Sequence, residues 1–320
     1  MSQARTIKNK IFDGYKLTQA EAQELYDFAE LKELAECADE IRKYFCGDGF
    51  DLCSIVNGKS GACPENCKFC AQSKRHTTGV ETYPLLNEGA VSNAALYNHN
   101  KGVNRFSIVT SGRTLSDGET DIVCKNYKSI AKTCDIFKCA SHGLLTYGQF
   151  ERLIDAGVKR YHCNLEASRN FFPKICTTHT YDDKLTTIRN AQKAGMEVCS
   201  GGIFGMGELP TDRIDMAFEL RELNVKSVPI NILNPIKGTP LGDLPVLNKD
   251  EVIRIVAVYR YILPDAAIRM AGGRGLFDDK GEAFFLSGAN AAATGDMLTT
   301  GGISIDSDKA LISKLGFKLK

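Results

Sequence analysis

Three cysteines in one short segment carry the clearest chemistry of this sequence. Residues 61–73 read GACPENCKFCAQS and place Cys63, Cys67 and Cys70 in a C-x3-C-x2-C array. Three thiolates this close together suit a cubic iron–sulfur cluster, which normally takes one cysteine for each iron. The next cysteine, Cys124, lies far along the chain. We therefore expect a [4Fe–4S] cluster with one iron left open for substrate chemistry.

A structural zinc site is the alternative interpretation of the same array. Such sites bind zinc through four ligands arranged as a tetrahedron. Only three sulfurs are present at this spacing, which is unusual for structural zinc. The array therefore favours a catalytic iron–sulfur cluster, and structural zinc stays as the alternative.

The N-terminal part of the chain is expected to be helical. Over residues 18–45, Thr18 and Glu21 can form a capping box, and apolar residues recur after them at helical spacing. We expect residues 1–48 to form a helical extension and residues 49–320 to form one barrel domain.

Short apolar segments recur beyond this extension at intervals long enough to hold a helix between them. The expected strands are 51–56, 105–110, 136–141, 160–165, 197–201, 227–233, 267–270 and 283–289. Helical patterns lie between them, as at 147–156, 182–194 and 211–223. Eight strand–helix units of this kind predict an α/β fold, a TIM-type (β/α)8 barrel, with a doubly wound open sheet as the alternative.

Sulfur and polar residues within the expected strands indicate a second metal site. Cys139, Cys163 and Cys199 fall on three consecutive strands, and Arg269 falls on a later one. Because side chains alternate faces along a strand, inward-facing positions on neighbouring strands approach one another. We expect the three thiols to converge on one cluster. The alternative is that each thiol is a small buried hydrophobic group.

Composition and charge exclude several functional classes. The chain has 320 residues, 43% of them hydrophobic, and a net charge of +1 without a basic block, so no nucleic-acid partner is expected. No apolar run is long enough to span a membrane, and the first residues lack the apolar region of a secretion signal. The 12 cysteines fit reduced thiols held for metal better than a secreted disulfide scaffold, which indicates a cytoplasmic protein.

These motifs resemble those of the radical S-adenosylmethionine (SAM) enzymes, and within them the biotin synthase family. C-x3-C-x2-C is the signature of the superfamily, and GACPENCKFCAQS resembles the form found in biotin synthases. The resemblance covers roughly residues 50–315 and includes VCSGGIFGMGE (198–208) and SVPINILNPIKGTPL (227–241). It implies a (β/α)8 barrel that is usually a homodimer.

The resemblance implies that dethiobiotin is converted to biotin by radical sulfur insertion. The open iron of the [4Fe–4S] cluster would bind SAM, and an electron from a donor such as flavodoxin or ferredoxin would release a 5′-deoxyadenosyl radical. Sulfur would come from an auxiliary iron–sulfur cluster deep in the barrel. In most family members this is a [2Fe–2S] cluster held by three cysteines and an arginine, of which Cys139, Cys199 and Arg269 match three.

One cysteine of that ligand set is missing from this sequence. Its position is occupied by Ser107, while Cys163 appears two strands away. We hypothesise that Cys139, Cys163 and Cys199 hold an altered auxiliary cluster with four irons and an extra sulfide. The rival is a conventional [2Fe–2S] cluster with Ser107 as an oxygen ligand, although serine binds soft metals less well than thiolate does.

The resemblance also implies contacts with SAM and with the substrate. Positions that bind SAM in the family are matched by Phe69, Asn164, Glu166, Lys184, Gly201, Gly202 and Gly205. Positions that bind the substrate are matched by Asn164, Asn231, Thr299 and Thr300. Among them, Asn231 is expected at the ureido ring of dethiobiotin and the two threonines at its carboxylate tail.

Other cysteines and other functions remain as alternatives. Packing is the expected role of Cys37, Cys46, Cys53, Cys124 and Cys134. Cys176 has no assigned role, and His179 in the same loop is a candidate contact for SAM. The functional alternatives are a methylornithine synthase-like or hydrogenase maturase-like radical SAM enzyme, and an iron–sulfur electron carrier without enzymatic activity.

Overall fold

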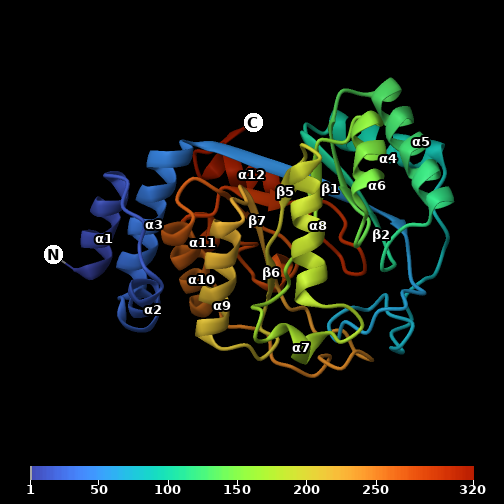
Figure 1. The fold of residues 1–320 in the computed structure, drawn as a ribbon. Coiled ribbons are helices and arrows are strands. Elements are labelled where there is room, and N and C mark those ends of the chain that lie inside the picture. The colour runs from blue at the N-terminus through green and yellow to red at the C-terminus, as the bar shows by residue number, and fades with distance from the viewer. Residues whose placement is uncertain (1) are drawn as a thin grey trace.

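A closed barrel of parallel strands forms the centre of the protein in the computed structural model, which describes residues 2–320 (Figure 1). Eight strands follow one another around the barrel: β1 (Gly49–Lys59), β2 (Arg105–Thr110), β3 (Phe137–Ser141), β4 (Arg160–His162), β5 (Glu197–Cys199), β7 (Ser227–Ile232), β8 (Ala267–Met270) and β9 (Ala291–Ala293). Pairing of β9 with β1 closes the ring. The structure therefore confirms the TIM-type (β/α)8 fold.

Two short strands lie outside this ring. β6 (Gly202–Phe204) follows β5 after a short break and pairs with β7. β10 (Lys318–Leu319) pairs in parallel with the first residues of β1. The C-terminal strand is thus tied to the amino end of the barrel.

Helices surround the barrel and alternate with its strands (Figure 1). The longer ones are α4 (Glu88–Asn100), α5 (Asp117–Thr133), α6 (Tyr147–Asp155), α8 (Tyr181–Lys193), α9 (Pro210–Glu222), α10 (Lys249–Ile262) and α12 (Ile305–Lys314). Short helical segments are α7 (Phe172–Ile175), η1 (Arg274–Leu276) and α11 (Glu282–Phe285). The predicted helices 147–156, 182–194 and 211–223 therefore correspond to α6, α8 and α9.

Three N-terminal helices form a layer outside the barrel. They are α1 (Gln3–Phe12), α2 (Gln19–Phe28) and α3 (Leu31–Cys46), and they pack against α9 and α10 (Figure 1). The predicted capping box is present, because Thr18 Oγ1 accepts a hydrogen bond from the Glu21 amide at 3.2 Å and the Glu21 carboxylate accepts one from the Thr18 amide at 2.8 Å. Arg254 of α10 donates to the carbonyl groups of Tyr26 and Ala29, which joins the layer to the barrel helices.

One expected strand was wrong. The segment 283–289 overlaps α11 (Glu282–Phe285), and the last barrel strand lies further on at Ala291–Ala293. Phe285 packs edge-on against Phe50 of β1, with ring centroids 4.9 Å apart, so this apolar segment covers the end of the barrel as a helical turn. The true strand consists of alanines, which carry almost no strand signal in a sequence.

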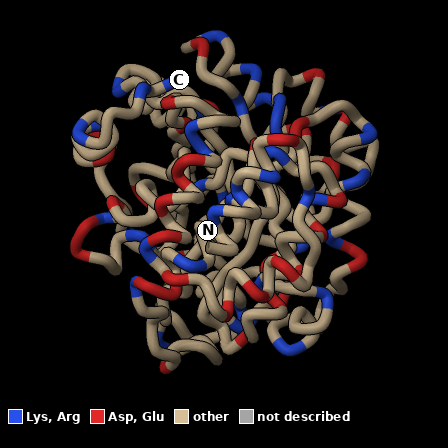
Figure 2. The backbone as a smooth tube through the Cα atoms, turned by 90° about the vertical axis from the view of Figure 1, so that its left-hand side faces the viewer, with Lys and Arg blue, Asp and Glu red and all other residues tan. Residues whose placement is uncertain are grey.

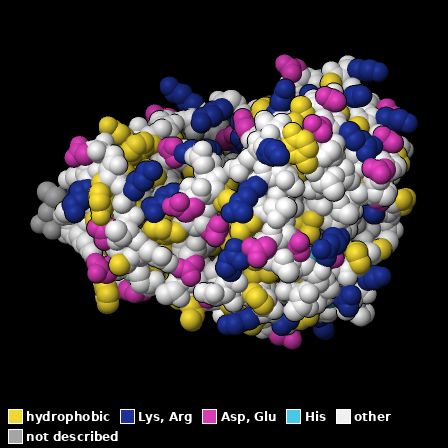
Figure 3. Space-filling view, in the orientation of Figure 1, with side chains coloured by type: hydrophobic (Ala, Val, Ile, Leu, Met, Phe, Trp, Pro, Cys, Tyr) yellow, Lys and Arg dark blue, Asp and Glu magenta, His cyan; other side chains and the backbone are white. Residues whose placement is uncertain are grey.

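Charged side chains are spread over the molecular surface. Figure 2 shows that acidic and basic residues alternate along the backbone, and Figure 3 shows their side chains interspersed on one face of the molecule. Within residues 2–320, no helix has both the length and the apolar character needed to cross a membrane.

A buried ion pair fixes α12 to the barrel. Arg274 donates two parallel hydrogen bonds to Asp308, both 2.7 Å long, and the side chains are only 2% and 1% exposed. Asp308→Asn is expected to lower the free energy of unfolding by about 3 kcal/mol, because it leaves the Arg274 charge buried without its partner. The control is Asp306→Asn. Asp306 also lies on α12, but its ion pair with Lys101 is exposed, so this change should alter the free energy of unfolding little. Urea denaturation measures both; equal effects would contradict the assignment.

A buried histidine predicts a pH dependence of stability. Burial lowers the pKa of His142 to about 3, and the ring interacts with Thr110 and Tyr127. Below the ordinary pKa of about 6.5 the unfolded chain binds a proton that the folded chain rejects, so stability falls as the pH drops. Between pH 7.5 and 5 the wild-type protein should lose about 2 kcal/mol more than His142→Gln. The exposed His99→Gln serves as the control, and its pH dependence should match the wild type.

Candidate functional site

The three cysteines of the C-x3-C-x2-C array lie in the loop that follows β1, at the carboxyl end of the barrel strands. Backbone hydrogen bonds fold this loop back on itself: Cys63 N donates to Gln72 O at 3.1 Å, and Lys74 N donates to Cys63 O at 2.9 Å. Cys70 N donates to Cys67 O at 3.0 Å, which forms a tight turn between these two cysteines. All three cysteines are half-buried.

All three of these cysteines line one cavity of about 230 Å³, which we call the cluster cavity. Its wall also includes Phe69, Glu166 and Lys184. One water molecule occupies about 30 Å³ in the liquid, so the cavity has room for a group far larger than a single ion. The thiols and the space around them therefore fit a polynuclear iron–sulfur cluster.

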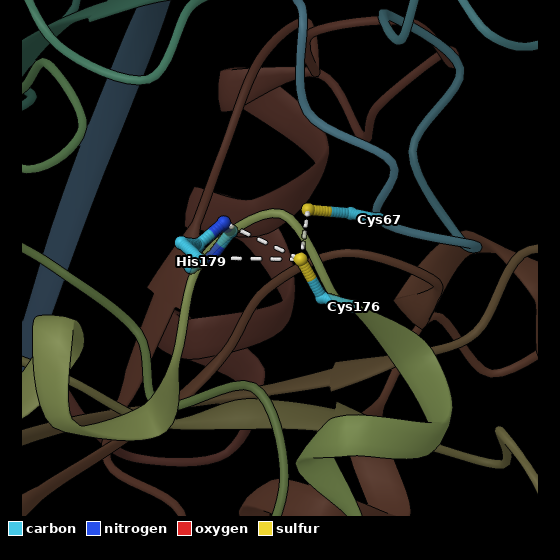
Figure 4. A group of neighbouring side chains, drawn as sticks. All are labelled: Cys67, Cys176 and His179. Atoms are coloured by element: carbon cyan, nitrogen blue, oxygen red, sulfur yellow. Dashed lines mark hydrogen bonds between the residues drawn. The ribbon is translucent and has the colours of Figure 1, made fainter.

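A fourth cysteine reaches the same cavity. Figure 4 shows the thiols of Cys67 and Cys176 pointing toward each other, with Cys176 also facing the ring of His179. The two sulfurs are 3.7 Å apart, and Cys176 Sγ lies 3.3 Å from His179 Nδ1. The hydrogen bond between the thiols, donated by Cys67 Sγ, raises the pKa of Cys67 and lowers that of Cys176.

Hydrogen bonds continue outward from this pair. Glu65 Oε2 contacts His179 Nδ1, and the Asn66 side chain accepts from the amides of Thr177 and Thr178 at 3.0 and 3.2 Å. Burial lowers the pKa of His179, but its bonds to Cys176 and Glu65 outweigh burial and raise it. The cysteine loop and the segment before α8 are thus joined by side chains from both.

A second cavity of about 250 Å³ extends into the barrel, and we call it the lumen cavity. Its wall includes Cys53, Cys163, Asn231 and Arg269, and Glu166 and Lys184 line it as well as the cluster cavity. A third, more open cavity of about 260 Å³ is lined by Phe69, Asn164, Glu166, Asn231, Thr299 and Thr300. The three cavities therefore meet at Glu166.

Glu166 is held in an unusual state at this junction. Its φ of 71° lies in the left-handed region, which few residues other than glycine adopt. Burial raises the pKa of its carboxyl group, although Lys184 opposes this shift. In the described part of the chain, its Oε2 is buried with no hydrogen-bond partner. Such a strained and unpaired carboxyl group is typical of a ligand contact.

Ion pairs occupy the floor of the lumen. Arg269 Nη2 donates to Asp51 Oδ1 at 2.9 Å, and Arg105 Nε donates to Asp51 Oδ2 at 2.6 Å. Burial alone would raise the pKa of Asp51, but the two guanidinium groups hold it at about 2. Arg269 also donates to the carbonyl of Ala292 at 3.0 Å, which locks its position.

The structure brings two of the three predicted barrel thiols together. Cys139 pairs with Arg160 of β4, and Arg160 pairs with Glu197, two residues before Cys199, so both thiols occupy inward positions of nearby barrel strands. Burial raises the pKa of Cys139, although the charge of Arg160 opposes this shift. Burial also raises the pKa of Cys199, but the charges of His162, Arg269 and Arg160 outweigh it and hold the pKa at about 6. The charges that act on Cys163 are those of Lys184 and Glu166, so this thiol lies nearer the mouth of the lumen.

Unsatisfied polar atoms around these thiols show that the lumen suits a further bound group. Of the side chains that the structure describes, Ser107 Oγ, His162 Nε2 and Arg269 Nε are buried without a hydrogen-bond partner. Buried polar groups are normally paired, and each exception calls for a water, an ion or a ligand. Thiols, a guanidinium group and these free polar atoms fit a sulfide-containing cluster.

Asn231 and the glycine-rich turn are tied to each other. Asn231 Nδ2 donates to Gly202 O at 3.1 Å, and its Oδ1 accepts from Gly272 N at 2.9 Å. One donor and one acceptor of the amide remain for a ligand. A Cβ on Gly201 would lie 2.0 Å from the Pro229 carbonyl oxygen, so glycine is required there for strand packing, a reason that the sequence did not reveal.

Two residues of the site were missed or left open in the sequence. Cys53 was expected only to pack, and it is buried, but it lines the lumen cavity. The alternation of β1 could have revealed it, because Cys53 shares a face with Ile55. Cys176 had no predicted role, and no local spacing relates it to Cys67. Cys37, Cys46, Cys124 and Cys134 line neither cavity, and Cys139 and Cys199, which are 1% and 0% exposed, do not form part of either wall.

Comparisons with known proteins agree with this geometry. Residues 59–221 match the profile of the Radical SAM superfamily, and residues 229–318 match that of the Biotin and Thiamin Synthesis associated domain. The biotin synthase of Clostridium botulinum (strain Hall) is 55% identical over 319 residues, which cover 100% of both chains. That of Brachyspira hyodysenteriae is 55% identical over 314 residues, 98% of this chain and 94% of the relative.

A solved structure has the same architecture. The crystal structure of methylornithine synthase superposes with a TM-score of 0.85 and covers 98% of this chain and 97% of its own. Its sequence identity is 17%, so this likeness shows the fold alone.

The contact between Cys67 and Cys176 predicts an effect on the reduction potential of a cluster bound at Cys63, Cys67 and Cys70. Cys67 bound to iron as thiolate could only accept, so Cys176 would then donate their hydrogen bond and would stabilise the more electron-rich reduced cluster. Cys176→Ala should therefore lower the potential by about 40 mV, the equivalent of one hydrogen bond of about 1 kcal/mol. Redox titration followed by electron paramagnetic resonance measures it. Cys176→Ser keeps a donor and is the control; equal potentials in all three proteins would contradict the role.

Proposed function

The chain belongs to the biotin synthase family of radical SAM enzymes. From this membership we propose that it converts dethiobiotin to biotin and that each cavity binds a different cofactor or the substrate. The family fixes the reaction class and two cofactors, a [4Fe–4S] cluster and SAM. The proposal concerns which residues bind each partner. The observation that carries it is that Glu166 and Lys184 line both the cluster cavity and the lumen cavity.

We assign the first cofactor site to the cluster cavity. Cys63, Cys67 and Cys70 would hold three irons, and the fourth iron would face the remaining space of the cavity. When bound, the cluster and SAM supply a radical that removes hydrogen from an unactivated carbon, and an auxiliary cluster supplies sulfur. No acid or base on this chain could remove such a hydrogen at neutral pH.

Several side chains at the cavity junction would orient SAM. Lys184 carries a positive charge suited to the SAM carboxylate, and the unpaired Glu166 carboxyl group suits the ribose hydroxyls, with Asn164 beside it. Phe69 lines the cluster cavity and the open cavity, where an aromatic ring can stack on adenine. Gly201, Gly202 and Gly205 line none of the three cavities, so their contact with SAM stays a prediction from the sequence.

The substrate would lie where the cavities meet. The free donor and acceptor of the Asn231 amide complement a flat ureido group, and Asn164 lines the same wall. Thr299 and Thr300 line the outer, more open cavity and would hold the carboxylate tail. In that pose the carbon chain of dethiobiotin would run between the two metal sites. Exclusion of water from this junction would protect a radical from side reactions.

We assign the sulfur source to an auxiliary iron–sulfur cluster in the lumen, near Cys139, Cys199 and Arg269. The unpaired Arg269 Nε and the adjacent thiols support this assignment. Whether the cluster has two irons or four irons with an extra sulfide depends on its third thiol, for which Cys163 is the expectation from sequence.

We also propose that the chain acts as a homodimer in the cytoplasm, with flavodoxin or ferredoxin as its electron donor. All twelve cysteines are free in the structure, which suits a reducing compartment. The comparisons do not favour the alternatives, because methylornithine synthase shares only the fold and the relatives of high identity are biotin synthases.

The proposed function predicts two products from one anaerobic reaction. The reconstituted protein, incubated with dethiobiotin, SAM and a reductant, should give biotin and 5′-deoxyadenosine, measured by mass spectrometry. Cys67→Ala removes a cluster ligand and should abolish both products. Cys124→Ala changes a cysteine of α5 whose thiol lies 3.5 Å from the Arg152 carbonyl, outside both cavities, and should retain them.

Other outcomes of this reaction separate the alternatives. Release of 5′-deoxyadenosine without biotin would contradict biotin synthesis and indicate another radical SAM enzyme. Formation of neither product by a fully loaded protein would favour an electron carrier.

A further inference from the structure

We propose that Cys53 is the third thiolate ligand of the lumen cluster, together with Cys139 and Cys199. The inference rests on the proposed function, because it names a ligand of the sulfur-donating site. It differs from the expectation from sequence, in which Cys163 holds this place and Cys53 only packs.

Strand alternation turns Cys53 inward. Cys53 and Ile55 of β1 both line the lumen cavity, as do Val109 of β2 and Ser141 of β3. Since every second residue of a strand shares a face, Cys139 points inward with Ser141. Cys53 therefore faces the interior of the barrel, as Cys139 does.

Strand register places Cys53 and Cys139 at the same depth. Cys53 pairs with Arg105 on β2, and Arg105 pairs with Phe137 on β3. Strands of a TIM barrel are tilted relative to the barrel axis. The residue of β3 at the same height as Cys53 therefore lies two positions after Phe137. That residue is Cys139.

The same rule, two strand pairings followed by a shift of two residues, relates the other members of one level around the barrel. From Cys139, pairing with Arg160 and then Glu197 leads to Cys199. From Cys199, pairing with Ser227 and then Ala267 leads to Arg269. From Arg269, pairing with Ala291 and then Asp51 leads back to Cys53. Four inward side chains from alternate strands make one layer of a TIM barrel, where branched apolar residues usually predominate. Here the layer consists of three thiols and one guanidinium group.

Cys163 lies outside this layer. It follows β4 (Arg160–His162), whose inward residues are Arg160 and His162, and its charged neighbours are Glu166 and Lys184 at the cavity junction. Arg269 of the layer instead donates from Nη2 to Asp51 Oδ1 at 2.9 Å, at the floor of the lumen.

The spacing of these thiols suits a polynuclear cluster. Ligands of one zinc ion lie within about 4.6 Å of one another, twice the zinc–sulfur bond length. Across residues 2–320, three such ligand atoms lie within 4.8 Å of one another only at Cys67, Cys176 and His179. The layer thiols are therefore spread more widely than one ion requires, which suits a cluster of several irons.

Unpaired polar atoms surround this layer. Arg269 Nε belongs to the layer, while Ser107 Oγ and His162 Nε2 come from inward residues one step nearer the barrel mouth, and within the described chain none of these buried atoms has a hydrogen-bond partner. A cluster bound to the layer would bring sulfides within reach of such donors.

Iron analysis in the full-length chain tests this ligand set. In a Cys63→Ala/Cys67→Ala/Cys70→Ala background, iron and sulfide bound after anaerobic reconstitution report on the lumen alone. Adding Cys53→Ala should lower the affinity for auxiliary iron by at least about tenfold, because even residues that only support a ligand contribute that much. Adding Cys163→Ala should leave the iron and sulfide content and the Mössbauer spectrum unchanged.

Three further variants serve as controls for this result. Cys139→Ala should lose iron as Cys53→Ala does, while Cys37→Ala changes a fully buried cysteine of α3 and should lose none. Cys53→Ser keeps nearly the volume of the thiol, so a changed Mössbauer spectrum in this folded variant would support ligation even if Cys53→Ala does not fold. Full iron with an unchanged spectrum in the Cys53 variants, or a loss in Cys163→Ala equal to that in Cys139→Ala, would overturn the inference. Absence of iron from the background protein would instead refute the lumen cluster itself, and this inference with it.

Discussion

In a closed barrel of parallel strands, every second side chain must point into the lumen, and the chemistry of this protein depends on which residues occupy those positions. Most barrels fill this space with branched apolar side chains. Here the inward positions carry thiols, arginines and one aspartate. The lumen therefore cannot be stabilised by hydrophobic packing alone, and each polar group needs a partner in a space that excludes water.

Asp51 stabilises this polar lumen by pairing with its arginines. It accepts hydrogen bonds from both Arg105 and Arg269, so a single carboxylate offsets one half-buried and one buried cation. Arg160 is paired separately, with Glu197, at 2.6 and 2.9 Å. One positive charge of the group around Asp51 thus remains without an acidic partner, and an anionic cluster held by thiolates would balance it. The same arrangement that destabilises an empty lumen favours a bound cluster.

Much of this organisation could be predicted from the sequence, because local patterns determine it. The strand–helix alternation gave seven of the barrel strands, and the spacing of Cys63, Cys67 and Cys70 gave the first site. The alanine strand β9 was missed because alanine has little preference for strands. The apolar segment before it, which was expected to be the strand, forms a helical turn through tertiary packing. The inward position of Cys53 follows from the alternation of β1, but its place relative to the other lumen thiols could not be predicted. Whether it joins Cys139 depends on the register of strands far apart in the chain, and no local pattern contains that information.

The two sites rest on different kinds of structure, and this difference matters for their roles. The first lies in a loop held by hydrogen bonds to the segment around Cys176, including Lys68 N to Ile175 O at 2.9 Å. Loops of this kind open at lower free energy than barrel strands do, so SAM can enter and leave there without disturbing the core. The lumen residues sit on paired strands, where a shift of Cys139 or Arg269 would break the register of the barrel. Under the proposed function, the partner exchanged at every turnover would bind at a loop, and the sulfur source would be held on paired strands.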